Sequence, residues 1–192
     1  MEWLINIDKD LLLLINTSWT HPALDIFFPQ ITDLHHTTFF KFIFIPFLFV
    51  YLLYNDMKKY AFILGGLVFS LALTDLIGGQ VIKPFFERAR PSVAGLEVIL
   101  RAPHFNGFSF ISNHSANMFC AATYVFQINK RVSSILFLFA SLIAYSRVYC
   151  GVHYPSDVLG GALFGACIGM IGSILMLKIK SKFSHDRMLT NG

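Results

Sequence analysis

Five stretches of the chain are apolar over lengths close to what a helix needs to cross a lipid bilayer. They cover residues 37–54, 60–82, 115–128, 132–150 and 157–177. A membrane-spanning helix needs about 20 mostly apolar residues, so the short third stretch has to borrow length from the loop before it. Only 14% of the 192 residues are charged, against roughly 25% in a soluble domain. This pattern excludes a soluble globule, a disordered chain, a coiled coil and a disulfide scaffold, and predicts an all-α integral membrane protein.

The N-terminal 36 residues carry a weaker signal. Polar residues interrupt the apolar stretch 11–32, which favours interfacial helices there, with a sixth span as the alternative. No internal repeat or second domain is visible, so residues 1–192 are expected to form one membrane-embedded domain. We expect it to comprise the N-terminal segment 1–36, which is interfacial or an extra span, a core bundle over 37–177 and a basic cytoplasmic tail over 178–192, with five to six transmembrane helices in all.

Lysine and arginine positions predict the orientation in the membrane. With five spans, one side carries Lys58, Lys59, Lys130, Arg131, Lys178, Lys180, Lys182 and Arg187. The positive-inside rule places that side in the cytoplasm and puts loops 83–113 and 147–157 together on the outer face. A bacterial-type inner (plasma) membrane with the site facing the periplasm or exterior is the expected setting. The net charge is +4, but most of the 15 Lys and Arg residues lie at the edges of apolar runs. The expected partner is therefore the lipid bilayer and not nucleic acid.

These two outer loops hold most of the residues capable of chemistry. Three cations, two histidines and a carboxylate in or directly beside these loops stand out: Lys83, Arg90, Arg147, His114, His153 and Asp157. A phosphate monoester carries about −1.5 to −2 charges, and the planar guanidinium fork of arginine matches its oxygens. The segment 83–113 is also long for a loop in a helical bundle, as functional loops often are. The collection predicts an outer-face catalytic loop that binds phosphate.

Two predicted helix starts strengthen this reading. Ser112 and Asn113 are capping residue types before the third apolar stretch, and Pro155 suits the first turn of the fifth. Helix N-termini offer free N–H groups and the positive end of the helix dipole to anions. Asp157 follows His153 by four residues, so its carboxylate could hold one imidazole nitrogen and leave the other free to attack.

Three segments resemble the signature of the type 2 phosphatidic acid phosphatase family, which is related to vanadium haloperoxidases. Its pattern is K-x6-R-P, then P-S-G-H, then S-R-x5-H-x3-D. Residues 83–91 match the first part and residues 146–157 match the third. In the middle part Ile111 replaces the proline and Asn113 replaces the glycine, while Ser112 and His114 are retained.

The resemblance implies a role for each matching residue. His153 would be the nucleophile that forms a phosphohistidine, Asp157 would orient it, and His114 would protonate the leaving oxygen. The nonbridging oxygens would be held by Lys83, Arg90, Ser112, Asn113 and Arg147. No metal or cofactor is implied. The roles of Arg88 and Asp75 are open: Arg88 could contact the phosphate, Glu87 or lipid headgroups, and Asp75 is expected to support the site or pack helices rather than take part in catalysis.

The expected function is therefore the metal-independent hydrolysis of a lipid phosphate or diphosphate in the membrane. Candidate substrates are undecaprenyl diphosphate, phosphatidylglycerophosphate, phosphatidic acid and lipid A phosphate. Two alternatives remain open. One is a lipid phosphotransferase, and the other is a non-catalytic transporter or binding protein for anionic headgroups.

Overall fold

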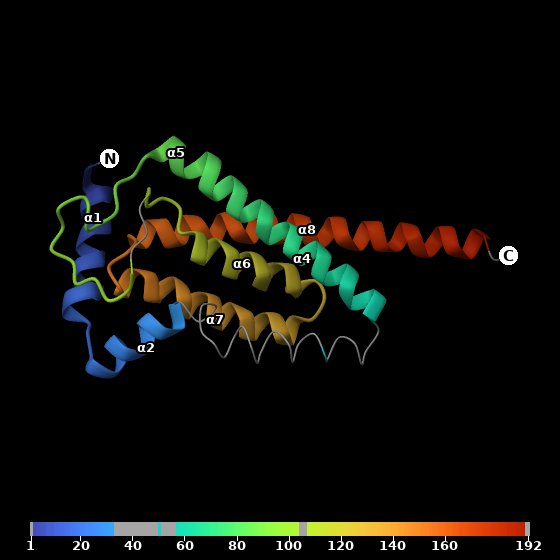
Figure 1. Ribbon diagram of the computed structural model, residues 1–192, viewed down its shortest axis with the longest axis horizontal. Helices are drawn as coiled ribbons and strands as arrows, with labels where there is room; N and C mark the ends of the chain where they lie inside the picture. Colours follow the sequence, from blue (N-terminus) through green and yellow to red (C-terminus); the bar gives the residue numbers. More distant parts are fainter. Residues whose placement is uncertain (1, 33–49, 51–56, 104–106, 191–192) are drawn as a thin grey trace.

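The computed structural model describes residues 2–32, 50, 57–103 and 107–190, and within these ranges the regular structure is all helical (Figure 1). The N-terminal part holds α1 (Glu2–Leu13), the π-helix η1 (Leu14–Ser18) and α2 (Pro22–Thr32). The rest holds α4 (Met57–Ile77), the π-helix η4 (Gly78–Ile82), α5 (Lys83–Phe86), α6 (Asn113–Phe126), α7 (Lys130–Tyr149) and α8 (Pro155–Thr190).

Three helical stretches in the described residues are long and apolar enough to span a membrane. They are Tyr60–Phe86, Lys130–Tyr149 and Pro155–Lys182. They correspond to the predicted spans 60–82, 132–150 and 157–177, the first of which is extended because η4 and α5 continue α4. The predicted span 37–54 lies outside the described residues. The predicted 115–128 helix is present as α6, which has 14 residues: it begins two residues earlier than predicted, at Asn113, and ends two residues earlier, at Phe126.

The four helices α4, α6, α7 and α8 run along the long axis of the molecule, and α1 and α2 lie at one end of it (Figure 1). In that view α1 runs across the bundle rather than along it. The stretch 11–32 is divided among α1, η1 and α2, with a break over residues 19–21, so it is not one continuous helix. The loop between α5 and α6 folds over the same end of the bundle, next to α1.

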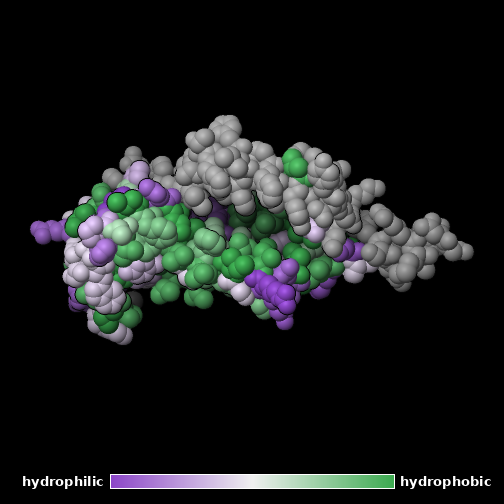
Figure 2. All heavy atoms as spheres, turned by 90° about the horizontal axis from the view of Figure 1, so that it is seen from below, coloured by the Kyte–Doolittle hydropathy of each residue, from purple (hydrophilic) through white to green (hydrophobic). Residues whose placement is uncertain are grey.

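Apolar side chains cover much of the visible bundle surface (Figure 2). Leu163 is 72% exposed and Leu138 is 61% exposed, although both lie in the middle of long helices. Such exposure would be costly in water but suits contact with hydrocarbon chains. The surface therefore agrees with the integral membrane class that the composition predicts.

A stripe of glycines brings α8 against α6. At Gly161, Gly165 and Gly169, a side-chain carbon would collide with the carbonyl oxygens of Ser112, Ala116 and Cys120 respectively. Residues four apart share one helix face, and small residues at this spacing let two membrane helices approach closely. Buried Ser115 adds a hydrogen bond across the contact by donating to the Val158 carbonyl at 2.7 Å. This contact brings the first turns of α6 and α8 together.

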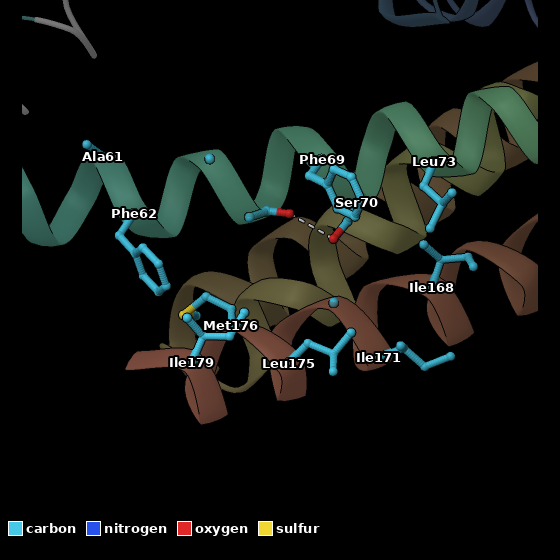
Figure 3. Close-up of a pocket in the computed structure, with 13 residues that line it drawn as sticks. Ala61, Phe62, Phe69, Ser70, Leu73, Ile168, Ile171, Leu175, Met176 and Ile179 are labelled. Carbon is cyan, nitrogen blue, oxygen red and sulfur yellow. Dashed lines mark hydrogen bonds between the residues drawn. The ribbon is translucent and has the colours of Figure 1, made fainter. Parts of the chain in front are cut away.

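The contact between α4 and α8 is more open. An apolar groove of about 440 Å³ lies between them, with Phe62, Phe69 and Leu73 on one side and Ile168, Ile171 and Leu175 on the other (Figure 3). The hydroxyl of Ser70, on the same stretch of α4, donates back to the Gly66 carbonyl at 2.8 Å. The polar group in the groove is thereby satisfied within its own helix, and the lining is otherwise hydrocarbon.

The close approach of α6 and α8 leads to the first prediction. Gly165→Ala places a methyl group against the Ala116 backbone, so the helices must separate, and we expect a loss of about 1–3 kcal/mol in stability. Gly65→Ala is the matched control, because it lies in another membrane-spanning helix with nothing within 4 Å of the added carbon. Thermal unfolding in detergent should show a lower midpoint for Gly165→Ala and an equal or higher one for Gly65→Ala. Equal midpoints for the two variants would contradict the packing argument.

Candidate active site

A cavity of about 260 Å³ lies at the end of the bundle where the α5–α6 loop and the α7–α8 turn meet. Its lining comes from five parts of the chain: Gly79, Lys83, Arg90, Gly107, Phe108, Asn113, His114, Arg147 and His153. Six of the eight residues proposed from the sequence are among them. The other two, Ser112 and Asp157, lie behind this lining. The structure therefore brings the separate sequence segments to one place.

His153 and Asp157 form the buried pair that their spacing predicts. His153 Nδ1 lies 3.3 Å from Asp157 Oδ2, and the side chains are 3% and 0% exposed. The same carboxylate oxygen accepts the Tyr154 N–H at 2.9 Å and the Ser109 hydroxyl at 2.5 Å. A carboxylate beside Nδ1 favours the tautomer with its proton there and leaves Nε2 without a proton.

Burial keeps the His153 ring neutral. It lowers the pKa of His153 from 6.5 to about 4, and the nearby Arg90 and Arg147 charges act in the same direction, while Asp157 opposes them. Arg90 Nη1 lies 3.5 Å from His153 Nε2. A neutral imidazole with an available lone pair at Nε2 is the form that can act as a nucleophile.

Backbone carbonyls and one hydroxyl hold the three cations in place. Arg90 donates to the carbonyls of Gly107 at 3.2 Å and Val152 at 3.1 Å, and Lys83 Nζ donates to the Phe108 carbonyl at 3.0 Å. Arg147 is 1% exposed and donates from Nη1 to the Thr32 hydroxyl of α2 at 2.9 Å. Burial lowers the pKa of Arg90, but a guanidinium stays charged in proteins. None of the lining residues is acidic, so the cavity is suited to an anion.

The first turn of α6 lies at the cavity edge, as predicted. Ser112 is its N-cap in an extended conformation, but its buried hydroxyl makes no capping hydrogen bond. Its backbone N–H instead donates to the Asp157 carbonyl at 3.0 Å, which ties the starts of α6 and α8 together. The N-cap position is confirmed, whereas the side-chain capping bond typical of serine is absent.

Asn113, the residue at the position of the family's glycine, faces α4. Its side-chain amide donates to Asp75 Oδ1 at 3.0 Å, and Asn117 donates to the same oxygen at 3.0 Å. Asp75 therefore supports the α6 start rather than lining the cavity, in agreement with the expectation of a supporting or helix-packing role. Between Asp75 and Lys83 the helix widens into η4, a π-helical turn of the kind often found at functional sites.

Three residues next to the His153–Asp157 pair have no motif in the sequence. Ser109 bonds to Asp157, as described above. Arg88 Nη1 lies 2.7 Å from Asp157 Oδ1, and Arg88 Nη2 lies 2.6 Å from Asp8 Oδ2. This differs from the contacts considered for Arg88 from the sequence, namely phosphate, Glu87 or lipid headgroups. Asp8 gave no signal beyond being a carboxylate in an amphipathic segment, because its burial depends on a contact distant in the sequence.

Together, the fold and the site define a class: a membrane-embedded helical protein with an oxyanion cavity, in which a buried histidine–carboxylate pair faces three cations. The described residues contain no group of three or more His, Cys, Asp or Glu side chains that could hold a metal ion. The sequence profile of the PAP2 superfamily matches residues 63–181. The chain belongs to this superfamily, and the resemblance seen in its motifs is confirmed.

Relatives with reported names match most of the chain. The lipid A 4'-phosphatase of Porphyromonas gingivalis is 30% identical over 175 residues, which cover 88% of this chain and 72% of that protein. The lipid A 4'-phosphatase of Bacteroides thetaiotaomicron is 27% identical over 97% of this chain and 84% of that protein.

Two crystal structures share the fold. Aquifex aeolicus LpxE superposes with a TM-score of 0.63 at 34% identity, covering 88% of this chain and 93% of that one. The transmembrane PAP2-type phosphatidylglycerolphosphate phosphatase of Bacillus subtilis gives a TM-score of 0.65 at 23% identity, covering 95% and 88%. The predicted class, an all-α integral membrane protein, is confirmed.

The buried environment of His153 leads to the second prediction. The ring should stay neutral as pH falls from 7 to 5 and take up a proton only near pH 4. Because a histidine in the unfolded chain titrates near 6.5, unfolding takes up a proton between these two values, and stability falls as pH drops through that window. NMR of histidine-labelled protein should show this low midpoint for one resonance that is missing in His153→Gln. A midpoint at or above 6.5 would contradict the lowering of the His153 pKa by burial.

Proposed function

We propose that the chain is a lipid phosphatase that transfers a phosphoryl group from a membrane lipid to His153 and then to water. The observation that carries this proposal is the neutral, buried His153 next to Asp157, facing a cavity lined by Lys83, Arg90 and Arg147. A cation-lined cavity alone could bind an anionic headgroup. The oriented imidazole adds a nucleophile, which binding does not require.

In the first step His153 Nε2 attacks phosphorus, and the bond from phosphorus to the lipid oxygen breaks. His114, which lines the same cavity, gives a proton to the departing oxygen, so the lipid leaves as an alcohol or a shorter phosphate. Asp157 keeps the Nδ1 proton in place and stabilises the positive charge that develops on the ring. In the second step water attacks the phosphohistidine and releases inorganic phosphate.

The cations stabilise the charge of the transferred group. Lys83, Arg90 and Arg147 provide in this scheme the neutralisation that Mg²⁺ gives in many phosphoryl-transfer enzymes. Ser112 and the backbone N–H of Asn113, at the start of α6, are proposed to add hydrogen bonds to the nonbridging oxygens. Removing one donor of this kind costs about 10²–10³ in rate in comparable oxyanion sites.

The proposed substrate is a phosphorylated lipid, reached from within the membrane. The names of the two relatives that match over most of the chain favour lipid A phosphate among the four candidate lipids. Lys130 and Arg131 start α7, and Arg147 lies near its other end. At 1.5 Å per residue these ends are roughly 24 Å apart, so the basic turn and the site lie at opposite ends of a span. With basic residues in the cytoplasm, this supports a site on the outer face of a bacterial inner membrane.

The third prediction concerns the nucleophile. Detergent-purified protein should release phosphate from at least one of the four candidate lipids, and His153→Ala should lower this rate by about 10³ or more, because the imidazole that Asp157 orients is removed. His21→Ala is the matched control, since His21 lies directly before α2 and outside the cavity lining. Phosphate release that survives in His153→Ala would refute the phosphohistidine route. Transfer to an acceptor without free phosphate would indicate a phosphotransferase.

The fourth prediction concerns inhibitors. Orthovanadate should inhibit competitively, because it mimics the trigonal transferred group and is held by the same cations, whereas EDTA should leave the rate within about twofold. Arg90→Gln should weaken vanadate inhibition and raise KM together, since both depend on the same guanidinium. Strong inhibition by EDTA that Mg²⁺ reverses would contradict a site that uses only side-chain cations.

A further inference from the structure

We propose that Asp8 of α1 is a positioning residue of the catalytic site and acts on the His153–Asp157 pair through Arg88. This inference rests on the proposed function and adds to it a part of the chain, residues 2–13, that carries no family motif. Asp8 and Asp157 lie 149 positions apart in the sequence, yet they share one guanidinium.

Arg88 bridges the two carboxylates with different nitrogens. Its Nη1 bonds to Asp157 Oδ1 at 2.7 Å, and its Nη2 bonds to Asp8 Oδ2 at 2.6 Å. The guanidinium carbon also lies 3.8 Å from the centre of the Tyr154 ring. Asp8 is 8% exposed and Asp157 is fully buried, so these ion pairs are screened by solvent much less than surface pairs are.

Asp8 also fixes the helix on which Asp157 lies. Its Oδ1 accepts the Ser156 backbone N–H at 2.8 Å, and its Oδ2 accepts the Ser156 hydroxyl at 2.5 Å. Ser156 is the second residue of α8, where backbone N–H groups have no partner within the helix. A carboxylate from α1 thus caps the first turn of α8, one residue before Asp157.

The backbone next to Arg88 is specialised for this contact. Glu87 adopts a left-handed conformation with φ of 44° and ends α5. Such a conformation is uncommon for a residue with a side chain. It turns the chain so that Arg88 reaches α1 and α8, while Lys83 and Arg90 on either side of the turn line the cavity.

The proposed role of Asp8 follows from the alternating charges of Asp8, Arg88 and Asp157. With Asp8 present, the Arg88 charge is shared between two carboxylates, so Asp157 keeps enough negative charge to stabilise an imidazolium at His153. Without Asp8, the full positive charge of Arg88 acts on Asp157, which weakens that stabilisation. The charged and titratable groups that face His153 are Asp157, Arg90, Arg147, Lys83 and His114, and all of them remain when Asp8 or Arg88 is replaced.

Replacing Asp8 and replacing Arg88 are therefore expected to shift the pH dependence of kcat/KM in opposite directions. Asp8→Asn makes the surroundings of His153 more positive, lowers its pKa further and shifts the acid limb of kcat/KM to lower pH. Arg88→Gln removes a positive charge and shifts the same limb to higher pH. A residue that only supported the fold would not shift the limb in these two directions.

The fifth prediction tests whether Asp8 acts on the His153–Asp157 pair through Arg88. Four variants are measured on the lipid that the wild type turns over best. Asp8→Asn should lower kcat about tenfold with KM within about twofold, the size expected for outer partners of a catalytic histidine. Asp10→Asn is the matched control, because it makes the same charge change at an exposed position of the same helix, and its kcat should equal that of the wild type. In an Arg88→Gln background, Asp8→Asn should cause no further loss of kcat.

Three results would overturn the proposal: equal kcat for Asp8→Asn and Asp10→Asn, a full additional loss in the Arg88→Gln background, or an effect on KM alone. If Asp8→Asn does not yield folded protein, Arg88→Gln alone replaces it, since it breaks the connection between Asp8 and Asp157 and leaves both carboxylates. Unchanged kcat together with an unshifted acid limb in folded Arg88→Gln would then also overturn the proposal. Failure of the proposed function is recognised separately, by a wild type and a His153→Ala variant that release phosphate equally or not at all.

Discussion

The backbone contact between α6 and α8 is the constraint on which the site depends. Lipid chains are as apolar as the helix surfaces, so membrane helices associate through close packing and hydrogen bonds more than through the hydrophobic effect. Glycines at positions 161, 165 and 169 let the two backbones meet, and the Ser112 N–H then donates to the Asp157 carbonyl. The contact therefore places the first turns of α6 and α8 together at one end of the bundle. The start of α6 lines the cavity, whereas the first turn of α8 is capped by Asp8 and carries the Asp157 side chain behind the lining.

Concentrating three cations beside a neutral histidine is unfavourable in the absence of an anion, and the surrounding structure offsets this. Lys83 and Arg90 donate to loop carbonyls, and Arg147 donates to the Thr32 hydroxyl on α2. These partners are neutral dipoles, which accept hydrogen bonds without cancelling the positive charge. A carboxylate in the same positions would have formed ion pairs and removed the attraction for phosphate. Asp157, the buried carboxylate in contact with His153, lies behind the ring and forms an ion pair with Arg88 through its other oxygen.

The sequence predicted the residues whose chemistry is local and missed those whose role depends on distant contacts. Apolar length predicted the spans near residues 60, 132 and 157, and the spacing of His153 and Asp157 predicted their pairing within one turn. The sequence could not show that Arg88 pairs with Asp8, because 80 residues separate them and many other carboxylates were equally available. Ser109 was missed for a similar reason, since a serine in a loop carries no signal until the loop folds onto Asp157.

The replacement of the family's glycine by Asn113 has a structural explanation in α4. Glu87 is the one residue other than glycine with positive φ in the described part of the chain, so Asn113 does not need the backbone freedom of glycine as the first residue of α6. Its side chain needs space and a partner instead. Gly78 provides the space, because a side-chain carbon there would lie 3.1 Å from Asn113 Oδ1, and Asp75 accepts the amide hydrogen. The asparagine side chain is thus directed toward α4, and its backbone N–H, at the first position of the helix, remains available to an anion in the cavity.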